Sequence, residues 1–186
     1  MNVTRRMVGI ALLGTALVVP PVILGSRSAG AVDVGELAPD FTLPSTNDSD
    51  ISLRDFRGKK FVLLEFYGAD FVPTCAANLL ARKADFKRFE ALGVQNLAIS
   101  ANLTFSQVTF AESLKLPFPL LSDFPDRKVI RSYGVLNEKM MTANRSFFLI
   151  DPQGILRRKW IAESGPTTVV YSDTLLREIQ QIVGKQ

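Results

Sequence analysis

The sequence predicts an α/β fold, a sandwich in which helices flank a mixed β-sheet. Short apolar runs between turn-forming residues predict buried strands at 60–67, 94–100 and 146–151. Segments with helical spacing of apolar residues separate these strands. The last strand is followed by a turn, a second strand and a final helix, so the sheet is expected to contain both parallel and antiparallel pairs.

The first half of the chain is expected to supply the central strand and the longest helix. Turn formers from Pro44 to Asp50 separate two short apolar stretches, which suggests a hairpin within an extended lead-in at 32–58. "KFVLLEFY" reads as a buried central strand, followed by a loop at 68–73. A helix is expected over 74–92, with Thr74 as its N-cap and a glycine after its last residue.

The second half predicts shorter elements of the same kinds. Ser172 or Asp173 is expected to cap the final helix, which reaches Val183. The remaining expected elements are a strand at 94–100, a helix at 104–115, a short helix near 126–133, and a hairpin whose strands, 146–151 and 155–162, flank the turn at 152–154.

Composition indicates one globular domain and excludes several kinds of chemistry. The chain has 186 residues, of which 47% are hydrophobic and 22% charged. Beyond residue 31 it carries 19 Lys and Arg against 18 Asp and Glu, which does not support a basic face for nucleic acid. The absence of histidine rules out a Ser-His-Asp triad, a Cys-His pair and a histidine metal cluster.

No cofactor or metal is expected. The chain has no Gly-rich phosphate-binding loop and no cluster of metal-ligating residues. Asp123 and Asp126 resemble a metal pair, but turn and cap roles explain them more simply. The only cysteine, Cys75, cannot form an internal disulfide, so any disulfide must involve another molecule.

Residues 1–31 have the three parts of an export signal. Arg5 and Arg6 precede a long apolar run, and the segment ends in Ala-Gly-Ala. Cleavage is expected after Ala31. The two arginines also suggest twin-arginine export, and the mature domain, 32–186, is expected in the periplasm or outside the cell. An uncleaved membrane anchor is the alternative, although the two prolines at 20–21 argue against a straight spanning helix.

The chain resembles the peroxiredoxins, the alkyl hydroperoxide reductase and thiol-specific antioxidant family. Six segments carry the resemblance, in the family's order: "APDFTL", "LRDFRGKKFVLLEFY", "FVPTC", "FPLLSD", "YGV" and "RSFFLID". The likeness extends from Val34 to Ile161. It implies a thioredoxin-like fold in which the peroxidatic cysteine lies in the first turn of a helix.

The resemblance also implies which residues do the chemistry. Cys75 corresponds to the peroxidatic cysteine, and Arg145 corresponds to a distant arginine that precedes a later strand. The helix N-terminus and this arginine would both favour the thiolate, without a histidine. The substrate pocket is expected to comprise Gly68, Phe71, Val72 and Thr74.

Three positions depart from the family pattern. Gly68 replaces a proline, Val72 replaces a threonine, and Asn78 replaces a glutamate. In the family, the threonine hydroxyl donates a hydrogen bond near the reacting peroxide, and valine has no donor. Because the loss of one preorganised donor costs about 100- to 1,000-fold in rate, we expect a slow peroxidase or one with a changed oxidant.

The implied reaction is that of a one-cysteine peroxidase. The Cys75 thiolate would attack hydrogen peroxide or an organic hydroperoxide and become a sulfenic acid, which an external thiol or redox protein would reduce. The resemblance also allows a homodimer. Two alternatives remain: a thiol-disulfide redox partner and a non-catalytic thioredoxin-fold interaction module. Asn78 counts against the redox partner, because it stands where the second cysteine of a Cys-x-x-Cys motif would be. A buried, unreactive Cys75 would favour the module.

Overall fold

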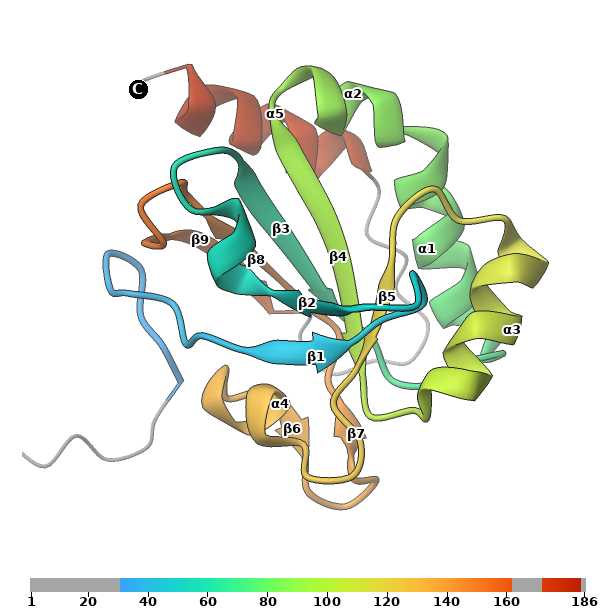
Figure 1. The fold of residues 1–186 in the computed structure, drawn as a ribbon. Helices are drawn as coiled ribbons and strands as arrows, with labels where there is room; N and C mark the ends of the chain where they lie inside the picture. The colour runs from blue at the N-terminus through green and yellow to red at the C-terminus, as the bar shows by residue number, and fades with distance from the viewer. Residues whose placement is uncertain (1–30, 162–171, 185–186) are drawn as a thin grey trace, which may run out of the picture.

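A computed structural model describes residues 31–161 and 172–184, in which a five-stranded mixed sheet forms the centre of the molecule (Figure 1). Its strands lie in the order β5-β4-β3-β8-β9. The expected N-terminal signal lies outside the described residues. The strands of this sheet are β3 (Phe61–Phe66), β4 (Val94–Ser100), β5 (Leu120–Ser122), β8 (Ser146–Ile150) and β9 (Leu156–Ile161).

Strand β3 occupies the middle of this sheet, as the sequence predicted. It runs parallel to β4 and antiparallel to β8, and β8 pairs with β9 as the expected hairpin. All six residues of β3 are buried, because layers of structure cover both faces of the sheet. This explains why its sequence is a continuous apolar run rather than an alternating one.

The two faces of the sheet are covered by different elements (Figure 1). Val62, Leu64 and Phe66 of β3 pack in a core with the N-terminal hairpin and α4. The alternate residues of β3 face the other helices, which form two further cores with the sheet. The hairpin is β1 (Thr42–Pro44) and β2 (Asp50–Ser52), and the helices are α1 (Pro73–Ala84), α2 (Phe86–Ala91), α3 (Thr104–Leu114), α4 (Lys128–Ser132) and α5 (Ser172–Val183).

The helix predicted over 74–92 is two helices. The chain leaves helical geometry at Asp85, where φ is −104° and ψ is 11°, and α2 begins at the next residue. Thr74 is not the N-cap as predicted: Val72 holds that position, and Pro73 is the first helical residue. Pro73 suits that place because its fixed φ and missing N–H cost nothing in the first turn.

Other boundaries are close to the prediction, with a few additions. The α3 and α5 helices agree within one residue, and α5 begins at Ser172, so the position of its N-cap lies outside the described residues. Arg127 holds the N-cap position of α4, and the carboxylate of Asp123 accepts a hydrogen bond of 2.7 Å from the N–H of Ile130 in the first turn of that helix. The sequence did not reveal the short 3-10 helix η1 (Leu53–Phe56), β5, or the small hairpin of β6 (Leu136–Asn137) and β7 (Thr142–Ala143).

In the part of the chain that the structure describes, no helix has the length and apolar character needed to cross a membrane.

Candidate active site

Cys75 lies in the first turn of α1, where this helix meets the carboxyl end of β3. Its side chain is nearly enclosed, with 4% of the residue exposed, and it belongs to the core that contains Tyr67, Leu79 and Phe110. The thiol is therefore held between the sheet and the helix rather than on an open surface. A peroxidatic thiol reacts as the thiolate, which nearby positive charge favours.

The start of α1 supplies part of that positive charge. Val72 is extended, with φ −73° and ψ 126°, and its carbonyl accepts the hydrogen bond of the Ala76 N–H at 2.9 Å. The N–H groups of Thr74 and Cys75 therefore lie in the turn that has no intrahelical acceptor. No side chain of Val72 caps them, and the positive end of the helix dipole is directed at the thiol region.

Gly68, in the loop after β3, lies near the sulfur of Cys75. A Cβ atom on Gly68 would lie 3.9 Å from Cys75 Sγ and 3.7 Å from the Ala143 carbonyl oxygen. The loop after β3, the first turn of α1 and the segment before β8 therefore meet at this point. Gly68 and Cys75 are brought together as expected for the pocket.

The other expected pocket residues line the outer edge of the same loop. Phe71 is 57% exposed, has a positive φ of 60°, and stacks near Phe110 with ring centroids 4.9 Å apart. Val72 is 40% exposed. Thr74 points its carbonyl into the helix, where it accepts a hydrogen bond of 2.7 Å from the side chain of the buried Asn78.

A buried network of hydrogen bonds connects the loop after β3 to α3. The Tyr67 hydroxyl donates to one oxygen of Asp70 at 2.9 Å, and the Ser106 hydroxyl donates to the other at 2.6 Å. Gln107 donates to the Tyr67 oxygen at 3.3 Å. Burial raises the pKa of Asp70, and the bonds from Ser106 and Tyr67 partly oppose this. Tyr67 is fully buried, and no feature of its local sequence indicated these partners.

Arg145 directly precedes β8, as predicted, and is half-buried. Along a strand, alternate residues share a face, so Arg145 continues the row of Phe147, which packs in the core on the helical side of the sheet. Its charge acts on a carboxyl group of β3, because Arg145 lowers the pKa of Glu65. Arg145 is thus on the same side of the sheet as α1.

Glu65 and Arg82 form a buried ion pair that sequence analysis missed. Arg82 Nε lies 3.6 Å from Glu65 Oε2, and the two side chains are only 1% and 4% exposed. Burial is the main influence on Glu65 and raises its pKa to about 7, while Arg82 and then Arg145 oppose the rise. Burial likewise lowers the pKa of Arg82.

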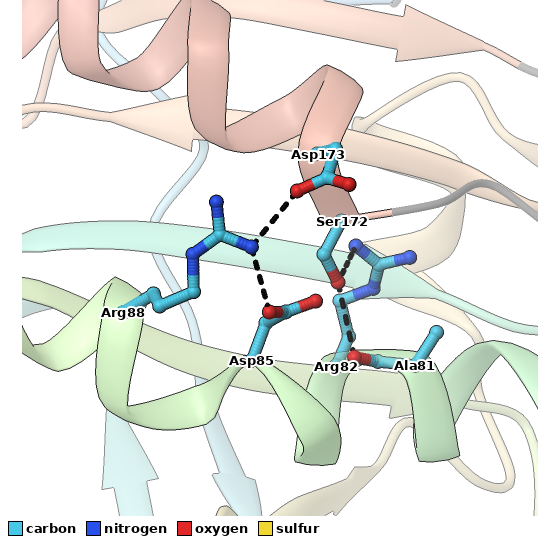
Figure 2. A network of polar contacts seen from close by, with 6 residues as sticks. All are labelled: Ala81, Arg82, Asp85, Arg88, Ser172 and Asp173. Carbon is cyan, nitrogen blue, oxygen red and sulfur yellow. Dashed lines mark hydrogen bonds and ion pairs between the residues drawn. The ribbon is translucent and has the colours of Figure 1, made fainter.

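Arg82 is fixed by further contacts. It donates a hydrogen bond of 2.8 Å to the Ser172 hydroxyl at the start of α5, which in turn donates to the Ala81 carbonyl at 3.0 Å (Figure 2). Its guanidinium also lies 5.3 Å from the ring centre of Phe147. One signal was available in the sequence: a lone glutamate within the apolar run "FVLLEFY", with an arginine on the buried face of the next helix.

The described residues contain no group of three or more Asp, Glu, Cys or His side chains that could hold a metal ion.

The profile of the AhpC/TSA family matches residues 34–159. The chain belongs to the AhpC/TSA family. The AhpC/TSA match includes both Cys75 and Arg145, and it agrees with the extent of the resemblance found in the sequence. The chain is a thiol-dependent peroxidase, an oxidoreductase.

Similar proteins support this assignment. Peroxiredoxin 2 of Thermoplasma acidophilum is 33% identical over 155 residues, which cover 80% of this chain and 75% of the relative. Alkyl hydroperoxide reductase E of Mycobacterium tuberculosis is 39% identical over 127 residues, covering 68% of this chain and 83% of the relative. The crystal structure of a reduced 2-Cys peroxiredoxin from Plasmodium vivax matches with a TM-score of 0.73 at 27% identity, over 80% of this chain and 95% of that one. The predicted thioredoxin-like α/β fold is thereby confirmed.

Replacing Gly68 by alanine in this AhpC/TSA chain tests the contact between the loop and the thiol. The added Cβ makes only ordinary contacts and the backbone at Gly68 is not left-handed, so we expect Gly68→Ala to raise the free energy of unfolding by about 0.4–1 kcal/mol. Because the new methyl group would touch Sγ, reaction of Cys75 with a thiol reagent should slow. Denaturant unfolding and the rate of thiol modification measure the two effects.

The matched control is Gly93→Ala, which makes the same chemical change in open space at a φ of +70°. Left-handed backbone is strained in alanine, so this variant should lose about 1 kcal/mol of stability and keep its thiol reactivity. Equal thiol reactivity in Gly68→Ala and the unchanged protein would contradict the contact.

Proposed function

We propose that this protein reduces peroxides at Cys75, with Arg145 stabilising the thiolate and the leaving oxygen, and that an external thiol completes the cycle. The observation that carries the proposal is the place of the only sulfhydryl in the chain. It lies in the first turn of α1, 3.9 Å from the Cβ position of Gly68, within the region that matches the AhpC/TSA family.

The first step is a two-electron transfer from sulfur to oxygen. The Cys75 thiolate attacks the terminal oxygen of R–O–O–H, an S–O bond forms and the O–O bond breaks. The sulfur becomes a sulfenic acid, and the leaving RO⁻ takes a proton to give an alcohol, or water when the substrate is hydrogen peroxide. The helix N-terminus and the Arg145 guanidinium supply the positive charge that this step needs.

The second step requires thiols from outside the chain. An external thiol condenses with the sulfenic acid to give a mixed disulfide and water. A second thiol attacks this disulfide, restores Cys75 and leaves with the first as an oxidised disulfide. The one-cysteine cycle rests on the cysteine count of the full sequence, which offers no resolving thiol within the chain. A homodimer, the arrangement that the resemblance allows, would add only a second copy of the same thiol.

The direct test is to trap the sulfenic acid. The full-length protein is treated with hydrogen peroxide and then with a sulfenic-acid reagent, and mass spectrometry locates the label. We expect labelling at Cys75 and thiol-dependent consumption of peroxide, and we expect Cys75→Ser to lose both. Peroxide consumption by Cys75→Ser at the rate of the unchanged protein would refute the proposal.

A second prediction concerns Val72. We expect Val72→Thr to increase the rate of thiol oxidation by peroxide by about 100-fold, because one preorganised donor is worth about 100- to 1,000-fold in rate. Val72 is also the N-cap of α1 and makes no side-chain cap bond, so threonine should add about 1 kcal/mol of stability. Stopped-flow kinetics and denaturant unfolding measure the two gains separately.

The control is Val72→Ile, which keeps the branched shape but adds no hydroxyl group. It should leave the rate of oxidation close to that of the unchanged protein. If the threonine variant stabilises the helix without speeding oxidation, the missing hydroxyl is not the reason for a slow reaction.

We also propose that the protein is exported through its N-terminal segment, in which two arginines precede a long apolar run and Ala29-Gly30-Ala31 offers a cleavage site. Expression of the full-length chain in a bacterium, followed by fractionation and mass determination of the N-terminus, tests this. We expect a protein that starts at residue 32 in the periplasm or medium. Recovery of the intact chain from the membrane would favour the uncleaved anchor, and recovery from the cytoplasm would refute export.

A further inference from the structure

A buried cluster of charges lies behind the reacting thiol. Glu65 and Arg82 are almost wholly enclosed, and Arg145 adds a third charge that acts on the same carboxyl group. Neither oxygen of Glu65 has a hydrogen-bond partner among the described residues, although Arg82 lies 3.6 Å away. Burying such charges is costly, and a glutamate in the central strand of a sheet calls for an explanation.

Helix α1 connects this cluster to Cys75. Cys75, Asn78 and Arg82 are all buried and lie three and seven residues apart, so they form one row along the face of α1 that packs on the sheet. Arg82 is two turns from Cys75, which corresponds to about 10 Å along the helix axis. Glu65 faces Arg82 from β3, so its carboxyl group also lies about two turns of the helix from Cys75.

The sheet connects the same carboxyl group to Arg145. Glu65 is paired with Phe147 in the antiparallel register of β3 and β8. Arg145 lies two residues before Phe147 and on the same face, so it is a diagonal neighbour of Glu65, at about 7–8 Å between backbones. Glu65 is therefore under the influence of two arginines, Arg82 from α1 and Arg145 from the neighbouring strand.

We propose that Glu65 is a positioning residue of the peroxidase reaction, whose charge governs, through Arg82 and Arg145, the fraction of Cys75 present as thiolate. Glu65 does not touch the peroxide. When its carboxyl group is neutral, the charges of both arginines favour the thiolate; when it is ionised, it cancels one of them. This deepens the proposed function and rests on it for its catalytic consequence.

Glu65 is the group in this cluster whose charge changes near neutral pH. Its pKa is raised to about 7, chiefly by burial. Tyr67, on the same face of β3, has a pKa raised well above its ordinary value and stays neutral, and Asp85 acts on Arg82 from the end of α1. The neighbouring strand β4 presents Ala98 and Asn96, which carry no charge.

The sign of the coupling follows from these charges. As the pH rises through about 7, Glu65 ionises and opposes the loss of the Cys75 proton. Two groups that oppose each other in this way titrate over a wider pH range than one group alone. The thiol of the unchanged protein should therefore ionise gradually, with a slope below that of a single independent group.

The experiment measures the rate of Cys75 alkylation by iodoacetamide as a function of pH in the full-length protein. Because the chain has one cysteine, the rate reports this thiol alone. We expect a broadened profile for the unchanged protein. We expect Glu65→Gln to give a profile of a single group, with its midpoint lowered by about one pH unit, the effect of a unit charge at about 10 Å in a protein interior.

Two further variants keep the outcome decisive. Asp123→Asn makes the same change at another buried carboxyl group, whose partner Ile130 packs on the opposite face of the sheet, and its profile should match that of the unchanged protein. Should Glu65→Gln fail to fold because Arg82 loses its partner, the double variant Glu65→Gln/Arg82→Met removes both charges and should also give a single-group profile.

A broadened profile that persists in Glu65→Gln, or in the double variant, would overturn the proposal. Alkylation needs no peroxide, so this result is separate from the test of peroxidase activity. If the pH profile shows no effect of Glu65 but the protein reduces peroxide, only the role of Glu65 is refuted. If the profile shows the effect of Glu65 but the protein never forms a sulfenic acid, the proposed function is refuted.

Discussion

The ion pair between Glu65 and Arg82 is the constraint on which the placement of the thiol depends. An arginine on the buried face of α1 is tolerated only if a negative charge meets it, because an isolated charge in a protein interior is far too costly. Glu65 meets that need from the middle of the central strand. The pair joins the last turn of α1 to β3, while the first turn of the same helix, with Cys75, meets the end of that strand.

The enclosure of Cys75 limits which molecules can reach it, since only 4% of the residue is exposed. The residue nevertheless lies in the first turn of α1, at the positive end of the helix dipole, where an anion is favoured. The fold thus combines a protected position with a local electrostatic environment that suits a thiolate.

Much of this architecture was predictable because it follows from local patterns. The run "FVLLEFY" predicted a central strand, and β3 is one; "VQNLAIS" predicted a strand whose bounds, Val94–Ser100, are the ones observed. The position of Cys75 in the first turn of a helix followed from the resemblance. The break at Asp85 did not, because apolar residues continue at helical spacing across it and only tertiary packing separates α1 from α2.

The polar partners of the site were the least predictable part. Tyr67 follows β3, whereas Ser106 and Gln107 are neighbours in α3. Nothing in the local sequence indicates that Tyr67 and Ser106 meet at Asp70, or that Gln107 reaches the Tyr67 hydroxyl. Glu65 and Arg82 are 17 positions apart, on a strand and a helix whose relative rotation decides whether they face each other. Sequence periodicity specifies which face of an element is buried, but not which atoms oppose one another across the interface.

The position of the carboxyl group explains one departure from the family pattern. The resemblance places a glutamate at 78, in the row of α1 between Cys75 and Arg82, where this chain has a neutral asparagine whose amide donates to the Thr74 carbonyl. The carboxyl group lies instead on β3, farther along the helix from the sulfur. A carboxylate at 78 would be one turn of the helix from Cys75, whereas Glu65 meets α1 at Arg82, two turns away. Because the interaction between charges weakens with distance, the chain keeps Arg82 paired with a carboxyl group that acts less on the sulfur than one at 78 would.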